Sequence, residues 1–94
     1  MGAIILTKLR VENFDSFKAQ YDRGEGVRRE LDARSVQLLR DASDPNLVTV
    51  VTRFDSVDAA KRMVSSDKWK QAAKGSAVGP MEASFHEIAE EKTY

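Results

Sequence analysis

Residues 36–56 (VQLLRDASDPNLVTVVTRFDS) constrain the fold more than any other part of the chain. Two runs rich in β-branched and aliphatic residues, Val36 to Arg40 and Leu47 to Phe54, flank the polar segment DASDPN. Proline presets the backbone φ angle, and Asp and Asn side chains bond the nearby backbone, so this segment favours a tight reversal between two strands. Asp55 and Ser56 then offer the short polar oxygens that cap a helix. These residues therefore predict a strand, a turn, a strand and a helix in succession.

The segments outside the hairpin supply two further strands and the remaining helices. Residues 3–11 (AIILTKLRV) and 81–88 (MEASFHEI) predict a first and a last strand, because they are rich in β-branched residues or alternate between apolar and polar.

Apolar residues at mostly three- and four-residue steps predict helical regions at 14–32, at 57–64 and, after a short interruption, at 68–74. Gly24 and Gly26 lie inside the first of these. Each glycine costs up to about 1 kcal/mol relative to alanine in a helix interior, so we expect a kink or a local opening there.

The predicted order of elements is β-α-β-β-α-β in a single domain that spans residues 1–94. Right-handed crossovers assemble this order into a ferredoxin-like α+β fold, in which an antiparallel sheet of order 4-1-3-2 carries its helices on one face. The third strand nevertheless has apolar residues on both faces, with Val48 and Val50 on one and Leu47 and Val51 on the other. A half-exposed antiparallel sheet should instead alternate with polar residues. We therefore expect a second copy of the chain to cover the open face, as a homodimer.

Composition narrows the partners and the compartment. The 94 residues carry fifteen Lys plus Arg, fifteen Asp plus Glu, one His and no Cys. Zero net charge removes the long-range attraction that nucleic-acid and anionic-membrane binding use. Without cysteine or a histidine pair there is no disulfide, no thiolate nucleophile and no recognisable metal motif. The apolar run from Ala3 to Leu6 is too short for a signal sequence or a membrane span, so we expect a cytoplasmic protein without nucleic-acid or membrane partners.

The family resemblance of the chain is carried by three segments: 11–22 (VENFDSFKAQYD), 40–66 (RDASDPNLVTVVTRFDSVDAAKRMVSS) and 75–88 (GSAVGPMEASFHEI). Together they resemble the dimeric α/β-barrel superfamily, which includes antibiotic-biosynthesis-monooxygenase-like proteins. The resemblance implies two sheets packed face to face, and a small-molecule cavity between sheet and helices in each subunit. It does not select one chemistry, because this scaffold hosts oxygenases, haem-degrading enzymes, isomerases and cyclases.

The motifs of the characterised members transfer only in part. Haem-degrading members use an Asn on the first strand and a His on a helix, whereas Asn13 here follows the first strand and His86 lies on the last. Haem is therefore not expected, nor is another cofactor. Cofactor-free oxygenases of the group use Asn, Trp and Arg around an aromatic substrate, and Trp69 with Arg53 resembles two of these three.

A polar constellation is expected on the open face. If Arg40 pairs with Leu47, then Arg34 lies opposite Arg53, and His86 shares their side of the sheet. Arg53 and His86 would be two strand spacings apart, roughly 10 Å, which leaves room for a carboxylate or an enolate. Arginine suits planar oxyanions and histidine exchanges protons near neutral pH. This hypothesis gives Arg53 and His86 catalytic roles and Arg34 a ligand-binding role.

Trp69 on the short helix and Tyr21 beside the glycine break are the other candidates, as ligand-binding residues at a cavity. Each assignment has a simpler structural alternative. Arginines at strand ends commonly pair with nearby acids such as Asp55 or Glu30, and a lone histidine is commonly structural. A tryptophan beside alanines equally fits a core stripe.

Two hypotheses about function follow from these residues. The first is a homodimer that binds an acidic or aromatic metabolite, with cofactor-independent oxygenase, isomerase or cyclase chemistry as the activities considered. The second is a non-catalytic binding or interaction module whose cavity is filled by its own side chains. A cavity lined by polar candidates would favour the first, and a packed interior with Arg53 in a surface salt bridge would favour the second.

Overall fold

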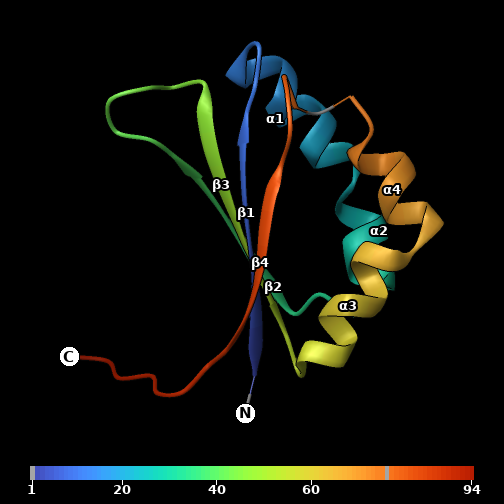
Figure 1. The fold of residues 1–94 in the computed structure, drawn as a ribbon, viewed down its shortest axis with the longest axis vertical. Coiled ribbons are helices and arrows are strands. Elements are labelled where there is room, and N and C mark those ends of the chain that lie inside the picture. Colours follow the sequence, from blue (N-terminus) through green and yellow to red (C-terminus); the bar gives the residue numbers. More distant parts are fainter. Residues whose placement is uncertain (1, 76) are drawn as a thin grey trace.

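The computed structural model of the protein describes residues 2–75 and 77–94. Figure 1 shows a four-stranded sheet with helices along one face, while the opposite face is open. The elements in chain order are β1 (Ala3–Arg10), α1 (Phe14–Arg23), α2 (Glu25–Glu30), β2 (Ser35–Arg40), β3 (Leu47–Phe54), α3 (Val57–Ser65), α4 (Asp67–Ala73) and β4 (Glu82–Glu87). The predicted ferredoxin-like α+β class is confirmed. The predicted helical region 14–32 is divided into α1 and α2, while α3 and α4 are separated as predicted.

The sheet has the strand order β2-β3-β1-β4, and all three neighbouring pairs are antiparallel. This order is the predicted one. Near the start of β1, Ile4 pairs with Arg53 of β3 on one side and with His86 of β4 on the other. Since side chains alternate across a strand, all three residues point to the open face.

The hairpin register differs from the predicted one by a single residue. Arg40 pairs with Val48 rather than with Leu47. The reason lies in Asp41, whose amide donates to the Leu47 carbonyl at 2.9 Å and so extends the ladder. Its carboxylate accepts hydrogen bonds from the amides two and three residues further on, both at 3.0 Å, so the chain reverses one residue later than expected.

Short polar side chains and a glycine set the helix boundaries. The Asn13 side chain caps α1 by accepting from the Ser16 amide at 3.0 Å, and the Ser56 hydroxyl caps α3 by accepting from the Ala59 amide at 3.1 Å. Gly24 separates α1 from α2, which confirms the predicted break in this helical region.

The core on the helix side of the sheet consists of two clusters. Along β1, the buried Ile5 belongs to one cluster and the buried Leu9 to the other, while Thr7 between them is half-buried. The first cluster contains Ile5, Phe54, Ala59, Ala60 and Met63, and the second contains Leu9, Val11, Phe17 and Val48. The core is therefore interrupted where a polar residue occupies the middle of the strand face.

The open face, which is the side of the sheet away from the helices, carries apolar and polar residues, and the pair Lys8–Thr49 separates Leu6 and Val51 from Leu47. Ile4 and Leu6 of β1 and Leu47 and Val51 of β3 project from it, because they alternate with the helix-side residues. All four side chains are only half-buried. The two-sided apolar pattern of these strands is thus a real property of the sheet.

Candidate functional site

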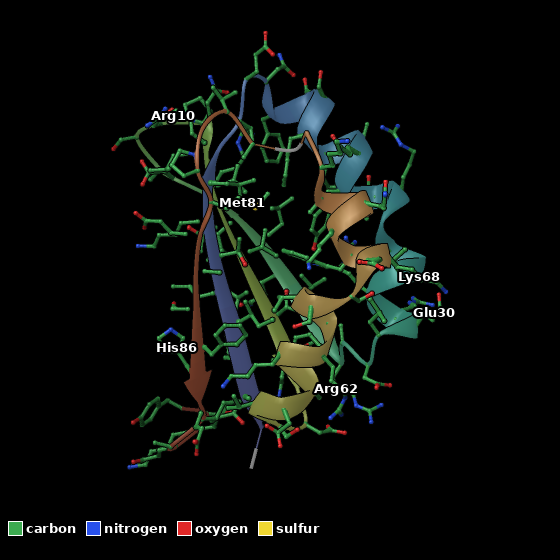
Figure 2. All side chains as sticks on the ribbon, turned by 45° about the vertical axis from the view of Figure 1, so that its right-hand side comes forward. Arg10, Glu30, Arg62, Lys68, Met81 and His86 are labelled. Atoms are coloured by element: carbon green, nitrogen blue, oxygen red, sulfur yellow. The ribbon has the colours of Figure 1, made fainter. Side chains whose placement is uncertain are left out.

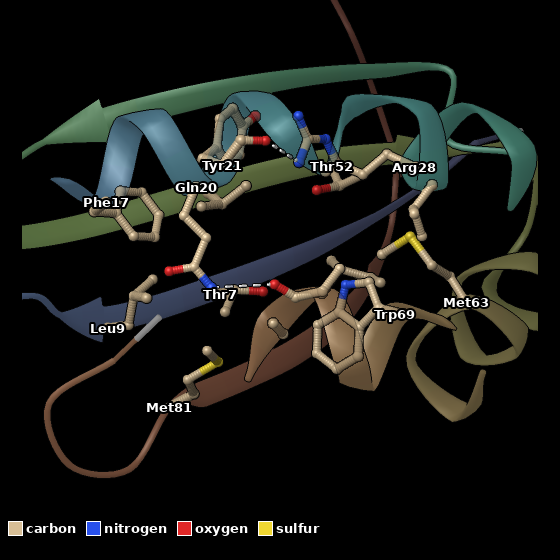
Figure 3. A pocket seen from close by; sticks show the side chains of 16 residues that line it. Thr7, Leu9, Phe17, Gln20, Tyr21, Arg28, Thr52, Met63, Trp69 and Met81 are labelled. Carbon is tan, nitrogen blue, oxygen red and sulfur yellow. Dashed lines mark hydrogen bonds between the residues drawn. The ribbon is translucent and has the colours of Figure 1, made fainter. Parts of the chain in front are cut away.

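A half-enclosed cavity occupies the gap between the two core clusters (Figure 3). Its floor is the helix-facing side of β1 and β3, and its walls come chiefly from α1, α2 and α4. The cavity volume is about 90 Å³. Most of the lining side chains are apolar, which is the usual character of a site for an organic ligand.

A few polar side chains reach this cavity from both sides. Thr7 and Thr52 belong to the floor, whereas Gln20, Tyr21 and Arg28 belong to the helical wall. Scattered polar groups in an apolar cavity orient a ligand without requiring a large desolvation cost. The cavity therefore has the means to hold an organic molecule in a preferred direction.

Gln20 closes one side of the cavity through hydrogen bonds. Its side-chain Nε2 donates to the carbonyl of Lys74 at 3.0 Å and, more weakly, to that of Ala72 at 3.4 Å. Figure 3 shows the Gln20 side chain reaching across from α1 toward α4. The two helices are thus joined above the cavity by polar contacts, which can open at less cost than packed apolar surface.

Tyr21 and Arg28 form a pair across the break between α1 and α2. The guanidinium carbon of Arg28 lies 3.9 Å from the centre of the Tyr21 ring, and its Nη1 donates to the Tyr21 carbonyl at 3.0 Å. Gly24 leaves room for this contact, because a Cβ atom there would lie 3.2 Å from Arg28 Nη1. The glycine between α1 and α2 therefore allows the Arg28 guanidinium to lie over the Tyr21 ring.

Two polar atoms of this pair lack partners. The Tyr21 hydroxyl and Arg28 Nε are buried and make no hydrogen bond within the described part of the chain. Burial raises the pKa of Tyr21, and the neighbouring Arg28 offsets this only in part, so the phenol is neutral at pH 7. Native proteins seldom leave buried donors unpaired, since each costs about 1–3 kcal/mol. Both atoms lie behind the accessible surface of the cavity, so a side-chain movement must bring either of them to a ligand.

Trp69 of α4 serves both the core and the cavity. Its half-buried ring packs against the first core cluster and also lines the cavity. It is the only tryptophan of the chain, so its spectroscopic signals report on this site alone.

The candidate residues from the sequence fall into two groups on opposite faces of the sheet. Tyr21 and Trp69 both line the cavity. Arg53 and His86 flank Ile4 on the open face, which is the side predicted for them, and Figure 2 shows His86 on the side of the sheet away from the helices. A ligand in the cavity therefore cannot touch both groups within one chain.

Both candidate arginines are held by carboxylates. Arg34 donates to Asp55 through Nη2 at 2.6 Å and Nε at 3.1 Å, and Arg53 makes two bonds of 2.8 Å to Glu91. These hydrogen bonds hold the pKa of the Asp55 and Glu91 carboxyls below their usual range. Moreover Ser35, and not Arg34, lies opposite Arg53. The expected meeting of Arg34 with Arg53 is thus corrected by the register of the hairpin.

Sequence reasoning missed most of the polar cavity residues. Thr7 gave a usable signal, because it interrupts an otherwise apolar strand face between Ile5 and Leu9. Arg28 gave almost none. Arg28 lies seven residues after Tyr21. Its position over the ring depends on the direction in which α2 continues from Gly24, and no local sequence pattern encodes that direction.

Within residues 2–75 and 77–94, no group of three or more His, Cys, Asp or Glu side chains is arranged to hold a metal ion. None of the helices in this described part of the chain is long and apolar enough to cross a bilayer.

A ferredoxin-like sheet with helices on one face and a cavity beneath them defines the class of the protein, the α+β fold of the dimeric α/β-barrel superfamily. The match to a sequence model then identifies the family. The chain belongs to the antibiotic biosynthesis monooxygenase family, whose model matches residues 2–75. No curated protein matches the chain.

Solved structures agree with this fold over almost the whole chain. SnoaB, a cofactor-independent oxygenase from Streptomyces nogalater, is 14% identical, with 96% of this chain and 95% of that chain covered and a TM-score of 0.82. A family member from Bordetella bronchiseptica is 16% identical, with coverages of 99% and 98% and a TM-score of 0.81. Rv0793 from Mycobacterium tuberculosis is 14% identical, with coverages of 99% and 100% and a TM-score of 0.77. At these identities the likeness establishes the fold alone.

Proposed function

We propose that this protein is a cytoplasmic homodimer that binds an acidic or aromatic metabolite between sheet and helices and oxygenates it without a cofactor. The observation that carries the proposal is the apolar cavity between the two core clusters, with Tyr21 and Trp69 in its wall and a buried Tyr21 hydroxyl that has no partner. A cavity filled by its own side chains, the alternative considered from the sequence, would leave no such space.

The cavity volume limits what can be enclosed. A dry engineered cavity of roughly 150 Å³ holds a benzene molecule. The cavity of about 90 Å³ therefore encloses part of an aromatic ring as it stands, and a larger ligand must extend through its open side or separate the helices. The hydrogen bonds of Gln20 to α4 are the contacts that such a ligand would displace.

Cofactor-independent oxygenation needs a hydrogen-bond donor at the developing negative charge and a site that excludes water, and these residues supply both. The described cavity lining holds no carboxylate or histidine, so the substrate must lose its proton to water at the open side of the cavity. The substrate itself supplies the electrons to dioxygen, so it must be an electron-rich molecule that loses a proton, such as a phenol or an enolisable ketone. When a CH₂ group becomes a carbonyl, one oxygen atom enters the product and the other leaves as water. Tyr21, kept protonated by its raised pKa, would donate to the substrate oxygen on which negative charge develops once its buried hydroxyl turns toward the ligand. The apolar walls would exclude water from the reactive carbanion.

The catalytic roles predicted for Arg53 and His86 require a different location. These residues project from the open face, and the His86 Nε2 atom lies 2.8 Å from the Ser84 hydroxyl. In a dimer they would act only on a ligand held between the two sheets. Under the proposal they are interface residues, and Arg34, paired with Asp55, does not line the cavity.

The dimer is supported by the open face. Ile4, Leu6, Leu47 and Val51 lie half-buried on this face, and no helix of residues 2–75 and 77–94 packs over it. Burial of apolar area contributes about 25 cal/mol per Å², so a second sheet packed on this face would stabilise both chains. Light scattering at micromolar concentration should give about twice the chain mass, and a monomer would contradict this part of the proposal.

Binding is tested by thermal unfolding with a set of phenols, quinones and aromatic acids. A ligand present at 100 times its dissociation constant stabilises the fold by about 2.7 kcal/mol, which corresponds to a rise of roughly 10–20 °C for a domain of this size. Ala73 lines the cavity, so Ala73→Leu should fill it and remove the shift. Lys70→Leu, at an exposed position on the same helix, is the matched control and should retain the shift.

Activity is tested with an oxygen electrode on every compound that binds. Consumption of dioxygen with oxygenated product, lost in Ala73→Leu and kept in Lys70→Leu, would support the enzymatic proposal. A thermal shift without oxygen consumption would support a non-catalytic binding protein instead. Absence of any shift across the whole set would contradict a small-molecule cavity.

A further inference from the structure

Arg28 lines a second hollow beside the cavity. This arginine groove, about 240 Å³ in volume, lies between α2 and the start of β2. It is defined by Glu25, Arg28, Arg29, Ala33, Arg34, Ser35 and Val36. Three arginines and one glutamate give it an excess of positive charge in a protein whose net charge is zero.

The groove continues the cavity rather than lying apart from it. Val36 in the groove and Thr52 in the cavity floor are register partners on neighbouring strands, so they lie side by side on the helix face of the sheet. Arg28 lines both hollows and stands between them. A molecule that extends from the cavity toward β2 would therefore meet the Arg28 guanidinium.

Of the three arginines, Arg28 has the capacity to bind an added anion. Arg34 already holds Asp55 through its Nε and Nη2 atoms. Arg29 has a distant partner in Glu25, at 3.6 Å, and its side chain is 78% exposed, so water satisfies it. Arg28 donates through Nη1 to a backbone carbonyl, and its Nε is buried without a partner.

The free edge of Arg28 is the one suited to a carboxylate. The Nε and Nη2 atoms of a guanidinium form a fork that matches two carboxylate oxygens. Arg34 uses this edge on Asp55, although both of its bonds go to the single oxygen Oδ2. In Arg28 neither atom of the edge bonds to any residue that the structure describes. Because the Nε atom is buried, the guanidinium must pivot away from the Tyr21 ring to meet a ligand, exchanging its contact with the ring and its bond to the Tyr21 carbonyl for the carboxylate.

We propose that Arg28 binds the carboxylate of an organic acid whose apolar part occupies the cavity, with the carboxylate at the boundary between cavity and arginine groove. This inference rests on the proposed function, because it needs a small molecule in the cavity. It goes further in naming an acid as the ligand class and Arg28 as the residue that selects it.

The test compares an acid with its neutral analogue by NMR. The full-length ¹⁵N-labelled protein is titrated with 2-naphthoate and, separately, with 2-naphthamide, and binding is followed at the single Trp69 indole N–H signal in the cavity wall. In the wild-type protein the acid should bind at least about tenfold more tightly than the amide. In Arg28→Gln this preference should fall below about twofold, while amide binding stays within about twofold of the wild-type value.

Two further variants show whether the preference for the acid depends on the guanidinium geometry of Arg28, on its charge, or on positive charge elsewhere on the protein. Arg28→Lys keeps the charge but loses the fork, so it should retain only part of the preference. Arg62→Gln removes an exposed arginine of α3 outside both hollows and should keep the full preference. Thermal unfolding of each variant confirms that it is folded before titration.

The outcomes distinguish this inference from the proposed function. If the amide binds as tightly as the acid to the wild-type protein, the cavity proposal stands and the role of Arg28 is refuted. Retention of the acid preference in Arg28→Gln, or its loss in Arg62→Gln, would also refute the role of Arg28. If neither compound changes the Trp69 signal at millimolar concentration, the proposed small-molecule site itself is contradicted.

Discussion

Gly24 and Gly26 offer a comparison that measures the Tyr21–Arg28 contact in the ligand-free protein. Both glycines lie at or within α2 with negative φ, so alanine fits their backbone conformations. Alanine in place of glycine at such sites stabilises a protein by about 0.5–1 kcal/mol. At Gly26 an added Cβ meets nothing within 4 Å, so Gly26→Ala should deliver this gain in full.

Gly24→Ala should behave differently, although its intrinsic gain is the same. Its Cβ would lie 3.2 Å from Arg28 Nη1 and 3.4 Å from the Tyr21 carbonyl, so the guanidinium must move. A cation over an aromatic ring contributes about 0.5–1 kcal/mol at partly exposed sites, and its hydrogen bond to the carbonyl contributes at least as much. We therefore expect a net change near zero or a loss of up to about 1 kcal/mol.

The assay is urea unfolding, followed by Trp69 fluorescence, at one fixed protein concentration because dimerisation would otherwise shift the apparent stability. Repeating Gly24→Ala in an Arg28→Gln background completes a double-mutant cycle, in which the gain of about 0.5–1 kcal/mol should reappear. If Gly24→Ala stabilises the unmodified protein as much as Gly26→Ala does, the guanidinium is not held as the structure indicates, and the reasoning is refuted.

Three other perturbations test separate parts of the structure. Leu6→Lys places a charge on the open face and should convert the proposed dimer to a monomer in light scattering, whereas a variant that stays dimeric would place the interface elsewhere. Tyr21→Phe removes a buried hydroxyl that has no partner, so ligand-free stability in urea should be unchanged or higher by up to about 1 kcal/mol; a clear loss would reveal a missed hydrogen bond. Asp55 has a lowered pKa because of Arg34, so its contribution is present above the ordinary carboxyl value of 3.8 and is lost as the pH falls through the lowered pKa. Asp55→Asn should accordingly be less stable than the wild-type protein at pH 7 and equal to it in acid, and a difference that persists below the folded pKa would contradict the ion pair as its cause.

The topology was predictable because it depends on local patterns that the sequence displays. The alternation of side chains along a strand was enough to predict that Arg53 and His86 lie on the open face. The Asp and Asn residues of the hairpin segment were enough to locate the chain reversal. The exact register was not predictable, since it depended on whether Asp41 would join the ladder or the turn. One hydrogen bond decides between these, and propensities do not resolve it.

The cavity was harder to predict than the sheet. Tyr21 and Trp69 were identified as residues near breaks in helices, and breaks are where side chains can face an opening. That they face the same opening depends on the angle at which α1 and α4 cross the sheet. Arg53 attracted attention as a charge within a strand, yet its partner Glu91 comes from the tail after β4, a segment with no predictable position.

The division of the core into two clusters has a consequence for the amount of folded protein in a cell. Ile5 and Leu9 anchor two separate apolar groups, and only the cavity lies between them. A molecule that fills this space would contact both clusters, make the core continuous and stabilise the folded state. The folded population, and with it resistance to proteolysis, would then rise with the supply of that molecule. Cellular abundance of the protein would in this way follow the concentration of its own ligand.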